Sequence, residues 1–133
     1  MKKVMVFGTF DILHPGHTHM LTEAKEYGDY LIAVVARDST VEQVKKKKPV
    51  YNQEIRVKNL ENLGIADEVL LGHEDDKHRI VSEINPDVVA LGYDQKFFID
   101  ELEKALGSHA KIVRLSPYFP EKYKSSKLAA TLD

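Results

Sequence analysis

The sequence predicts an α/β protein with a parallel sheet, and three observations support this prediction. Apolar runs such as residues 30–36 (YLIAVVA) have no polar alternation, which is typical of strands buried on both faces. Segments with apolar residues at helical spacing separate these runs. The chain has 133 residues, a length that suits one domain. Such alternation of strands and helices favours a parallel sheet flanked by helices.

We expect five strands and five helices, which alternate along the chain. The strands are expected at residues 1–8, 30–36, 68–71, 88–91 and 111–115, and the helices at 17–27, 52–62, 75–84, 98–106 and from 125 onward. Residues 37–51, with four successive lysines and a proline, are expected to be the least ordered stretch. Right-handed crossovers then predict a Rossmann-like, doubly wound sheet with strand order 3-2-1-4-5, in a single domain over residues 1–133.

Composition excludes several classes of protein. The hydrophobic fraction of 43% and the charged fraction of 30% argue against disorder. A formal net charge of -2 provides no overall basic field, so no nucleic-acid partner is expected. The chain has no cysteine, which removes disulfides and thiolate chemistry. No apolar run approaches the ~18 residues needed to cross a membrane. A soluble, cytoplasmic protein is expected.

Two loops are expected to open onto the same crevice. Ligands of open parallel sheets bind beyond the carboxyl ends of strands, where the winding direction reverses. Residues 9–17 follow the first predicted strand, and residues 92–95 follow the fourth. These two strands are neighbours in the predicted order, so their loops should meet at the reversal.

The first loop carries a histidine pair at a predicted helix start. His14 and His17 flank Pro15 and Gly16, where proline stiffens the turn and glycine permits close approach of a ligand. The free N–H groups and positive dipole end of a helix start suit phosphate. Imidazoles there can donate hydrogen bonds to a reacting phosphoryl group. Zinc binding is disfavoured because only Asp11 is nearby as a further ligand, so no metal ligand is assigned.

Residues 8–17 (GTFDILHPGH) resemble the signature of the cytidylyltransferase-like nucleotidyltransferases, and the resemblance extends over nearly the whole chain. Within that family, residues 91–95 (LGYDQ), 35–38 (VARD) and 71–74 (LGHE) are most similar to archaeal-type FAD synthases, which are FMN adenylyltransferases. Glycerol-3-phosphate cytidylyltransferase is the next most similar member.

The resemblance implies roles for individual residues. His14 and His17 would stabilise the α-phosphate as the catalytic pair. The predicted nucleotide-binding residues are Thr9, Phe10, His14, Pro15, Gly16, His17, Asp94, Tyr118, Ser125 and Ser126. The predicted phosphate-binding residues are Lys45, Lys46, Lys47, Lys48 and Arg56, with no single lysine chosen.

The expected reaction is transfer of AMP from ATP to FMN, which gives FAD and pyrophosphate. A divalent cation, Mg²⁺, would be bound with the triphosphate, and a homodimer is implied by the resemblance. Two alternatives remain open. One is a CTP-dependent cytidylyltransferase acting on glycerol 3-phosphate or a similar alcohol phosphate. The other is a nucleotide-binding sensor without turnover.

Overall fold

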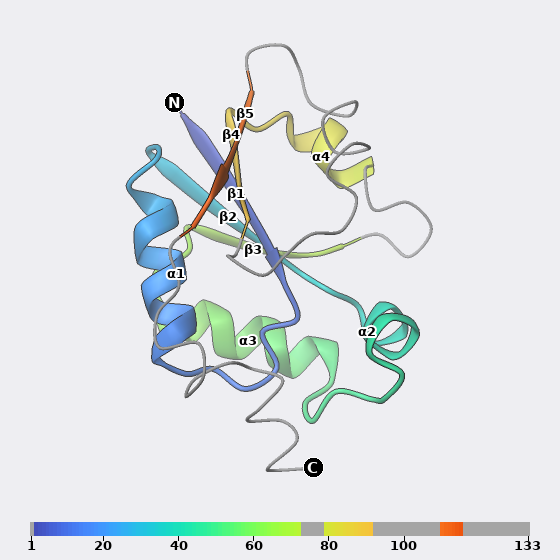
Figure 1. Ribbon diagram of the computed structural model, residues 1–133. Helices are drawn as coiled ribbons and strands as arrows, with labels where there is room; N and C mark the ends of the chain where they lie inside the picture. The colour runs from blue at the N-terminus through green and yellow to red at the C-terminus, as the bar shows by residue number, and fades with distance from the viewer. Residues whose placement is uncertain (1, 73–78, 92–109, 116–133) are drawn as a thin grey trace.

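A five-stranded, fully parallel sheet forms the centre of the molecule (Figure 1). The computed structural model describes residues 2–72, 79–91 and 110–115. The strands are β1 (Lys3–Gly8), β2 (Tyr30–Val35), β3 (Glu68–Leu71), β4 (Val88–Leu91) and β5 (Lys111–Arg114). Their order is β3-β2-β1-β4-β5, which confirms the predicted fold class and strand order. The winding direction therefore reverses between β1 and β4.

Helices cover both faces of this sheet. The described helices are α1 (Pro15–Lys25), α2 (Asp38–Lys45), α3 (Gln53–Leu63) and α4 (Arg79–Ile84). In Figure 1, α1 and α3 lie together on one side of the sheet and α4 lies on the other. No helix among the described residues is long and apolar enough to cross a membrane.

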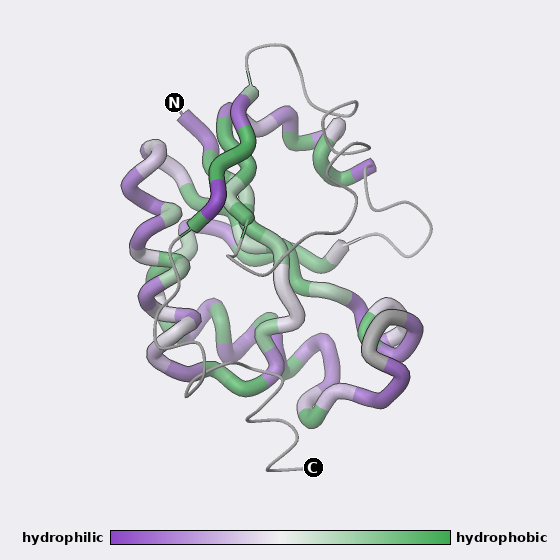
Figure 2. Tube along the Cα trace, viewed as in Figure 1, coloured by the Kyte–Doolittle hydropathy of each residue, from purple (hydrophilic) through white to green (hydrophobic). Residues whose placement is uncertain are grey.

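The strand sequences are apolar throughout because each face of the sheet has its own core. On one face, Val4 and Val6 of β1 pack in a cluster with Leu21 of α1 and Leu60 of α3. On the other face, the alternate strand residues pack against Ile80 and Val81 of α4. Figure 2 shows the hydrophobic colour running along the central strands, with hydrophilic residues on the outer sides of the helices. Burial on both faces thus explains the lack of polar alternation.

The structure corrects the expectation of a poorly ordered stretch over residues 37–51. Helix α2 occupies Asp38–Lys45 and ends at Lys46, whose φ of 62° is left-handed. Its usual start signal is missing, because Arg37 at the N-cap makes no side-chain capping hydrogen bond. Only Val41 is a described core residue in this helix. The stretch before the lysine run is therefore a short helix, and Val41 is the one buried apolar residue among its described side chains.

The other predicted helices that fall on described residues are confirmed, with changes at their ends. Helix α1 begins at Pro15 rather than residue 17, and α3 is capped by the side chain of Asn52. In α3, the apolar Ile55 is 44% exposed, whereas Arg56 beside it is fully buried. The start of the helix predicted from residue 75, and the helices predicted at 98–106 and after 125, lie outside the described residues.

We predict that Gly28→Ala lowers the free energy of unfolding by about 1–3 kcal/mol, the usual cost of overpacking. A Cβ at Gly28 would lie 2.6 Å from the Lys2 carbonyl oxygen and 2.7 Å from Cγ2 of Val4. Gly72→Ala is the matched control, because its Cβ would meet nothing nearer than 3.6 Å. Urea denaturation of both variants measures the effect, and equal stability losses would contradict the assigned clash.

Candidate functional site

The loop after β1, residues 9–14, is called the signature loop. It leaves the carboxyl end of β1 beside β4, at the point where the winding direction reverses. Phe10 turns the loop back toward the sheet: its φ is 53°, in the left-handed region that few side chains adopt, and its ring is only 2% exposed. Gly8 leaves room for that ring, because a Cβ there would lie 2.9 Å from Phe10 Cε2. The buried ring thereby fixes the start of the loop.

His14 forms the N-cap of α1. Its backbone is extended (φ -147°, ψ 173°), and its Nδ1 accepts a hydrogen bond of 3.0 Å from the Gly16 N–H. Pro15 occupies the first turn, where a missing N–H costs nothing. Because Nδ1 is the acceptor, a neutral His14 ring carries its proton on Nε2. The cap therefore selects the tautomer that can donate from Nε2 to a ligand.

The two histidine rings lie together at the start of α1. Their centroids are 4.1 Å apart, with 38° between the ring planes. The Phe10 ring also contacts His17, with the two ring centroids 5.5 Å apart. The structure thus brings together the signature loop, the histidine pair and the first turn of α1, as the sequence predicted. This end of the helix carries the positive end of its dipole.

Burial lowers the pKa of His14 from its ordinary value of 6.5. The physical cause is desolvation, which disfavours the charged ring. Protonation would also place a hydrogen on Nδ1, which now accepts the Gly16 N–H. Both effects favour the neutral ring at neutral pH.

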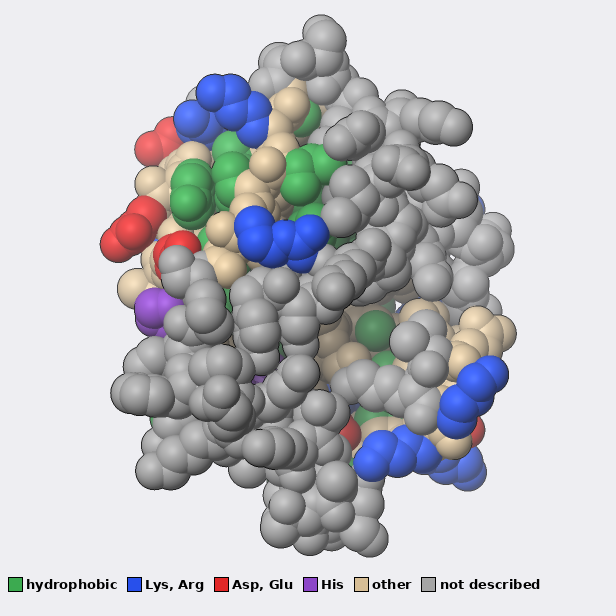
Figure 3. Space-filling model, viewed as in Figure 1, with side chains coloured by type: hydrophobic (Ala, Val, Ile, Leu, Met, Phe, Trp, Pro, Cys, Tyr) green, Lys and Arg blue, Asp and Glu red, His purple; other side chains and the backbone are tan. Residues whose placement is uncertain are grey.

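The predicted phosphate-binding lysines lie at the end of α2 and directly after it. Lys46, Lys47 and Lys48 are exposed, and they begin the connection from α2 to α3. Figure 3 shows Lys and Arg side chains gathered at the lower right, where Figure 1 places α2. The side chain of Lys45 is outside the description, and so are Asp94, Tyr118, Ser125 and Ser126.

Arg56 does not lie where a phosphate contact would require. Its side chain is fully buried and donates hydrogen bonds to the carbonyl oxygens of Thr9 and Tyr51, at 2.7 and 3.0 Å. A third hydrogen bond of 2.7 Å reaches Oδ1 of Asp38. A guanidinium without exposed surface presents no face to a ligand, so this geometry gives no support to the predicted phosphate contact. The phosphate contact of Arg56 was implied by the family resemblance, in which a basic residue lies in the helix after the lysine run.

Sequence reasoning missed the roles of Asp11 and Asp38. Asp11 accepts hydrogen bonds from the backbone N–H groups of Val50 and Tyr51, at 2.7 and 2.8 Å. Asp38 pairs with the buried Arg56 at 2.7 Å. Their partners are distant in the sequence, so spacing carried no signal for either contact. The identity of Asp11, a carboxylate in a turn between strand and helix, was the only available indication.

The fold and this site are those of a Rossmann-like protein whose first crossover helix begins with a histidine pair, at the point where the winding direction of the sheet reverses. The model of the cytidylyltransferase-like family matches residues 5–132, and the chain belongs to that family. This confirms the resemblance of the signature.

Individual relatives are similar over most of their length. The chain is 49% identical to the FAD synthase of Aciduliprofundum boonei, over 89% of this chain and 80% of that protein. It is 45% identical to the FAD synthase of Picrophilus torridus, over 95% of this chain and 92% of that protein. A crystal structure from Thermoplasma volcanium, titled as a lipopolysaccharide core biosynthesis protein, superposes with a TM-score of 0.82 at 45% identity, over 89% of this chain and 98% of that chain.

We predict that the contribution of His14 to stability depends on pH. The native state binds this proton less readily than the unfolded chain, because burial lowers the pKa below 6.5. The contribution is therefore complete above pH 6.5 and is lost as pH falls through the lowered pKa. His14→Asn keeps a good N-cap without a titrating ring.

Urea denaturation of wild type and His14→Asn at about pH 8 and pH 5 measures this difference. The stability of wild type relative to the variant should fall at the lower pH. A pH-independent difference, or one that moves the other way, would contradict the burial and capping assigned to His14.

Proposed function

We propose that this protein is an FAD synthase that transfers AMP from ATP to FMN and releases pyrophosphate. The observation that carries the proposal is the pair of imidazoles, 4.1 Å apart, at the start of α1. The names of the relatives from Aciduliprofundum boonei and Picrophilus torridus support FMN as the acceptor. We further propose that the enzyme acts in the cytoplasm as a homodimer, as the family resemblance suggests.

The proposed reaction is a direct in-line displacement. A phosphate oxygen of FMN attacks the α-phosphorus of ATP and forms the new P–O bond. The bond from the α-phosphorus to the oxygen bridging the α- and β-phosphates breaks, and its electron pair leaves with pyrophosphate. The acceptor phosphate is already ionised at neutral pH, so the step needs neither a protein nucleophile nor a general base. Catalysis then depends on positioning and on stabilising charge.

The first turn of α1 provides this stabilisation. With Nδ1 of His14 engaged by the Gly16 N–H, the neutral ring carries its proton on Nε2, which would donate to an α-phosphoryl oxygen. His17 stands beside it for a second oxygen, and the positive end of the helix dipole adds to the same field. These donors are fixed before the substrate arrives, so no reorganisation is needed as charge develops.

The remaining contacts are proposed from the resemblance. The exposed lysines at 46–48 would neutralise the outer phosphates, together with Ser125 and Ser126. Asp94 and Tyr118 would contact the nucleoside. Mg²⁺ would be bound mainly by the triphosphate itself, since this ion keeps several waters and favours phosphate oxygens. No group of three or more His, Asp or Glu suited to a metal lies among the described residues, so we assign no protein ligand.

A substrate screen tests the proposal. Each nucleoside triphosphate is incubated with the protein, Mg²⁺ and either FMN or glycerol 3-phosphate, and pyrophosphate release is measured together with the product. ATP with FMN should give FAD and pyrophosphate in equal amounts. Turnover only with CTP and glycerol 3-phosphate would show that the enzyme is a cytidylyltransferase and would contradict ATP and FMN as its substrates. Binding of ATP without product from any acceptor would instead indicate a sensor.

We predict that His14→Ala and His17→Ala each lower kcat for FAD formation by about 10²–10³-fold, the loss expected when one oxyanion-type donor is removed. His19→Ala is the matched control, because its ring lies on the next turn of α1, where it pairs with Glu23 at 3.4 Å. Steady-state rates with ATP and FMN measure the effect. A variant at position 14 or 17 with full turnover would remove that residue from the mechanism.

A further inference from the structure

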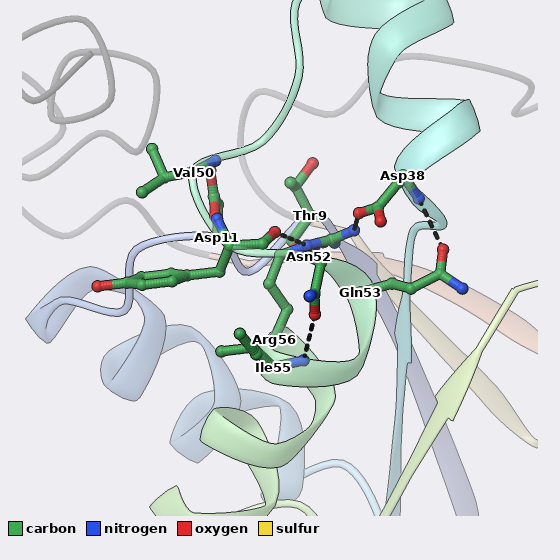
Figure 4. Close-up of polar contacts among 9 residues, drawn as sticks. Thr9, Asp11, Asp38, Val50, Asn52, Gln53, Ile55 and Arg56 are labelled. Atoms are coloured by element: carbon green, nitrogen blue, oxygen red, sulfur yellow. Dashed lines mark hydrogen bonds and ion pairs between the residues drawn. The ribbon is translucent and has the colours of Figure 1, made fainter.

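A buried polar network joins the signature loop to the connection between α2 and α3. At its centre is Asp11, a carboxylate that is only 8% exposed. One of its oxygens, Oδ2, accepts the Val50 N–H at 2.7 Å, and the other, Oδ1, accepts the Tyr51 N–H at 2.8 Å. Figure 4 shows Asp11 next to the backbone at Val50. Both oxygens of this carboxylate are therefore committed to backbone that lies 39 and 40 residues further along the chain.

Arg56 closes the network from the side of α3. In Figure 4 its side chain extends from the helix toward Thr9 and Asp38. Its three hydrogen bonds reach the signature loop at Thr9, the end of the connection at Tyr51, and the first turn of α2 at Asp38. One buried guanidinium thus holds three segments, a task for which its rigid fork of donors is suited.

The neighbouring helix starts strengthen this frame. The side chain of Gln53 accepts the backbone N–H of Asp38 at 3.0 Å, so the beginnings of α2 and α3 are bonded together. Asn52 caps α3 by accepting the Ile55 N–H at 2.9 Å. The connection of residues 46–51, here called the lysine segment, is therefore held at Val50 and Tyr51, where it enters α3, and it follows a helix whose first turn is bonded to α3.

Neither Asp11 nor Arg56 is exposed enough to touch a substrate, but the lysines between their anchor points are. Long lysine side chains lose rotamer freedom when they bind, and a mobile backbone would add to that cost. A backbone held against the signature loop reduces the ordering needed on binding. The network thus has the placement needed to act on substrate through the lysine segment.

We propose that Asp11 and Arg56 are positioning residues that hold the lysine segment against the signature loop, so that its lysines meet the outer phosphates of ATP. This inference rests on the proposed function for the role of the lysines. It gives Arg56 an indirect part in catalysis in place of direct phosphate contact.

The primary test variant is Asp11→Asn, which keeps the shape but replaces one acceptor oxygen with an NH₂ group. One of the two N–H donors, of Val50 or Tyr51, then loses its acceptor. We expect kcat/KM for ATP to fall about tenfold, the size of one charge-assisted hydrogen bond. The KM for FMN should stay within about twofold, because the lysine segment is assigned to the other substrate.

Asp67→Asn is the matched structural control. Asp67 also accepts a backbone N–H, that of Leu31 at 2.8 Å, and pairs with Lys25 at 3.7 Å. It lies just before β3, at the amino edge of the sheet, away from the signature loop. Its replacement should lower the melting temperature while leaving both KM values and kcat near wild type. An equal loss of kcat/KM in Asp67→Asn would overturn a specific positioning role for Asp11.

A double-mutant cycle separates positioning from general damage. The lysines are neutralised as Lys46→Asn, Lys47→Gln and Lys48→Gln, with asparagine at 46 because that residue has a φ of 62°. In this background, Asp11→Asn should change kcat/KM for ATP by less than about twofold. A full tenfold loss in both backgrounds would overturn the proposal. Arg56→Lys, which keeps charge but loses the fork, should behave like Asp11→Asn in the same cycle.

Hydrogen exchange tests the network without any turnover. In full-length Asp11→Asn, the amides of Val50 and Tyr51 should exchange about tenfold faster or more, while the Leu31 amide is unchanged. Asp67→Asn should show the reverse pattern. Unchanged exchange at Val50 and Tyr51 would overturn the proposal even if FAD is formed. If the wild-type protein makes no FAD but the Val50 and Tyr51 amides still exchange faster in Asp11→Asn, the network is supported and the proposed function is rejected.

Discussion

The hydrogen bond from the Gly16 N–H to Nδ1 of His14 is the contact on which the site depends. It begins α1, sets the tautomer of His14 and fixes the ring beside His17. A serine or aspartate would cap the helix equally well, but neither would leave an N–H donor directed outward. The capping residue can therefore also be the ligand-binding residue. The same ring thus caps the helix through Nδ1 and is placed to bind phosphate through Nε2.

The parallel sheet places this helix start where a ligand can reach it. Strands β1 and β4 are neighbours, so the signature loop emerges where the winding direction reverses. Gly8 and the buried Phe10 ring fix the loop to the core, and Asp11 and Arg56 fix it to the lysine segment. A loop held from both sides provides the preorganisation on which electrostatic catalysis depends.

The sequence was sufficient for the fold because the strands are buried on both faces. Each apolar run between turn residues matched one strand, and β3 and β4 were predicted to the residue. Helix α2 was missed because its N-cap residue makes no capping hydrogen bond and its last residue belongs to the lysine run. A pattern of polar residues around the single described core residue, Val41, gives too little periodicity to distinguish a helix from a loop.

The site was predictable only where its parts are close in sequence. His14 and His17 share one helix start, so their spacing and the Pro-Gly between them were informative. Arg56 and Asp11 act through contacts with residues up to 47 positions away, which no local pattern encodes. On α3, the apolar Ile55 is exposed and the arginine beside it is buried, so hydropathy alone does not identify the buried position. Long-range polar contacts of this kind need the structure.

A crystal structure of the protein with a non-hydrolysable ATP analogue and Mg²⁺ tests the central claim most directly. We predict that the α-phosphate lies at the start of α1, with its oxygens within hydrogen-bonding distance of His14 Nε2 and the His17 ring. An α-phosphate bound elsewhere, with both rings facing water, would contradict it.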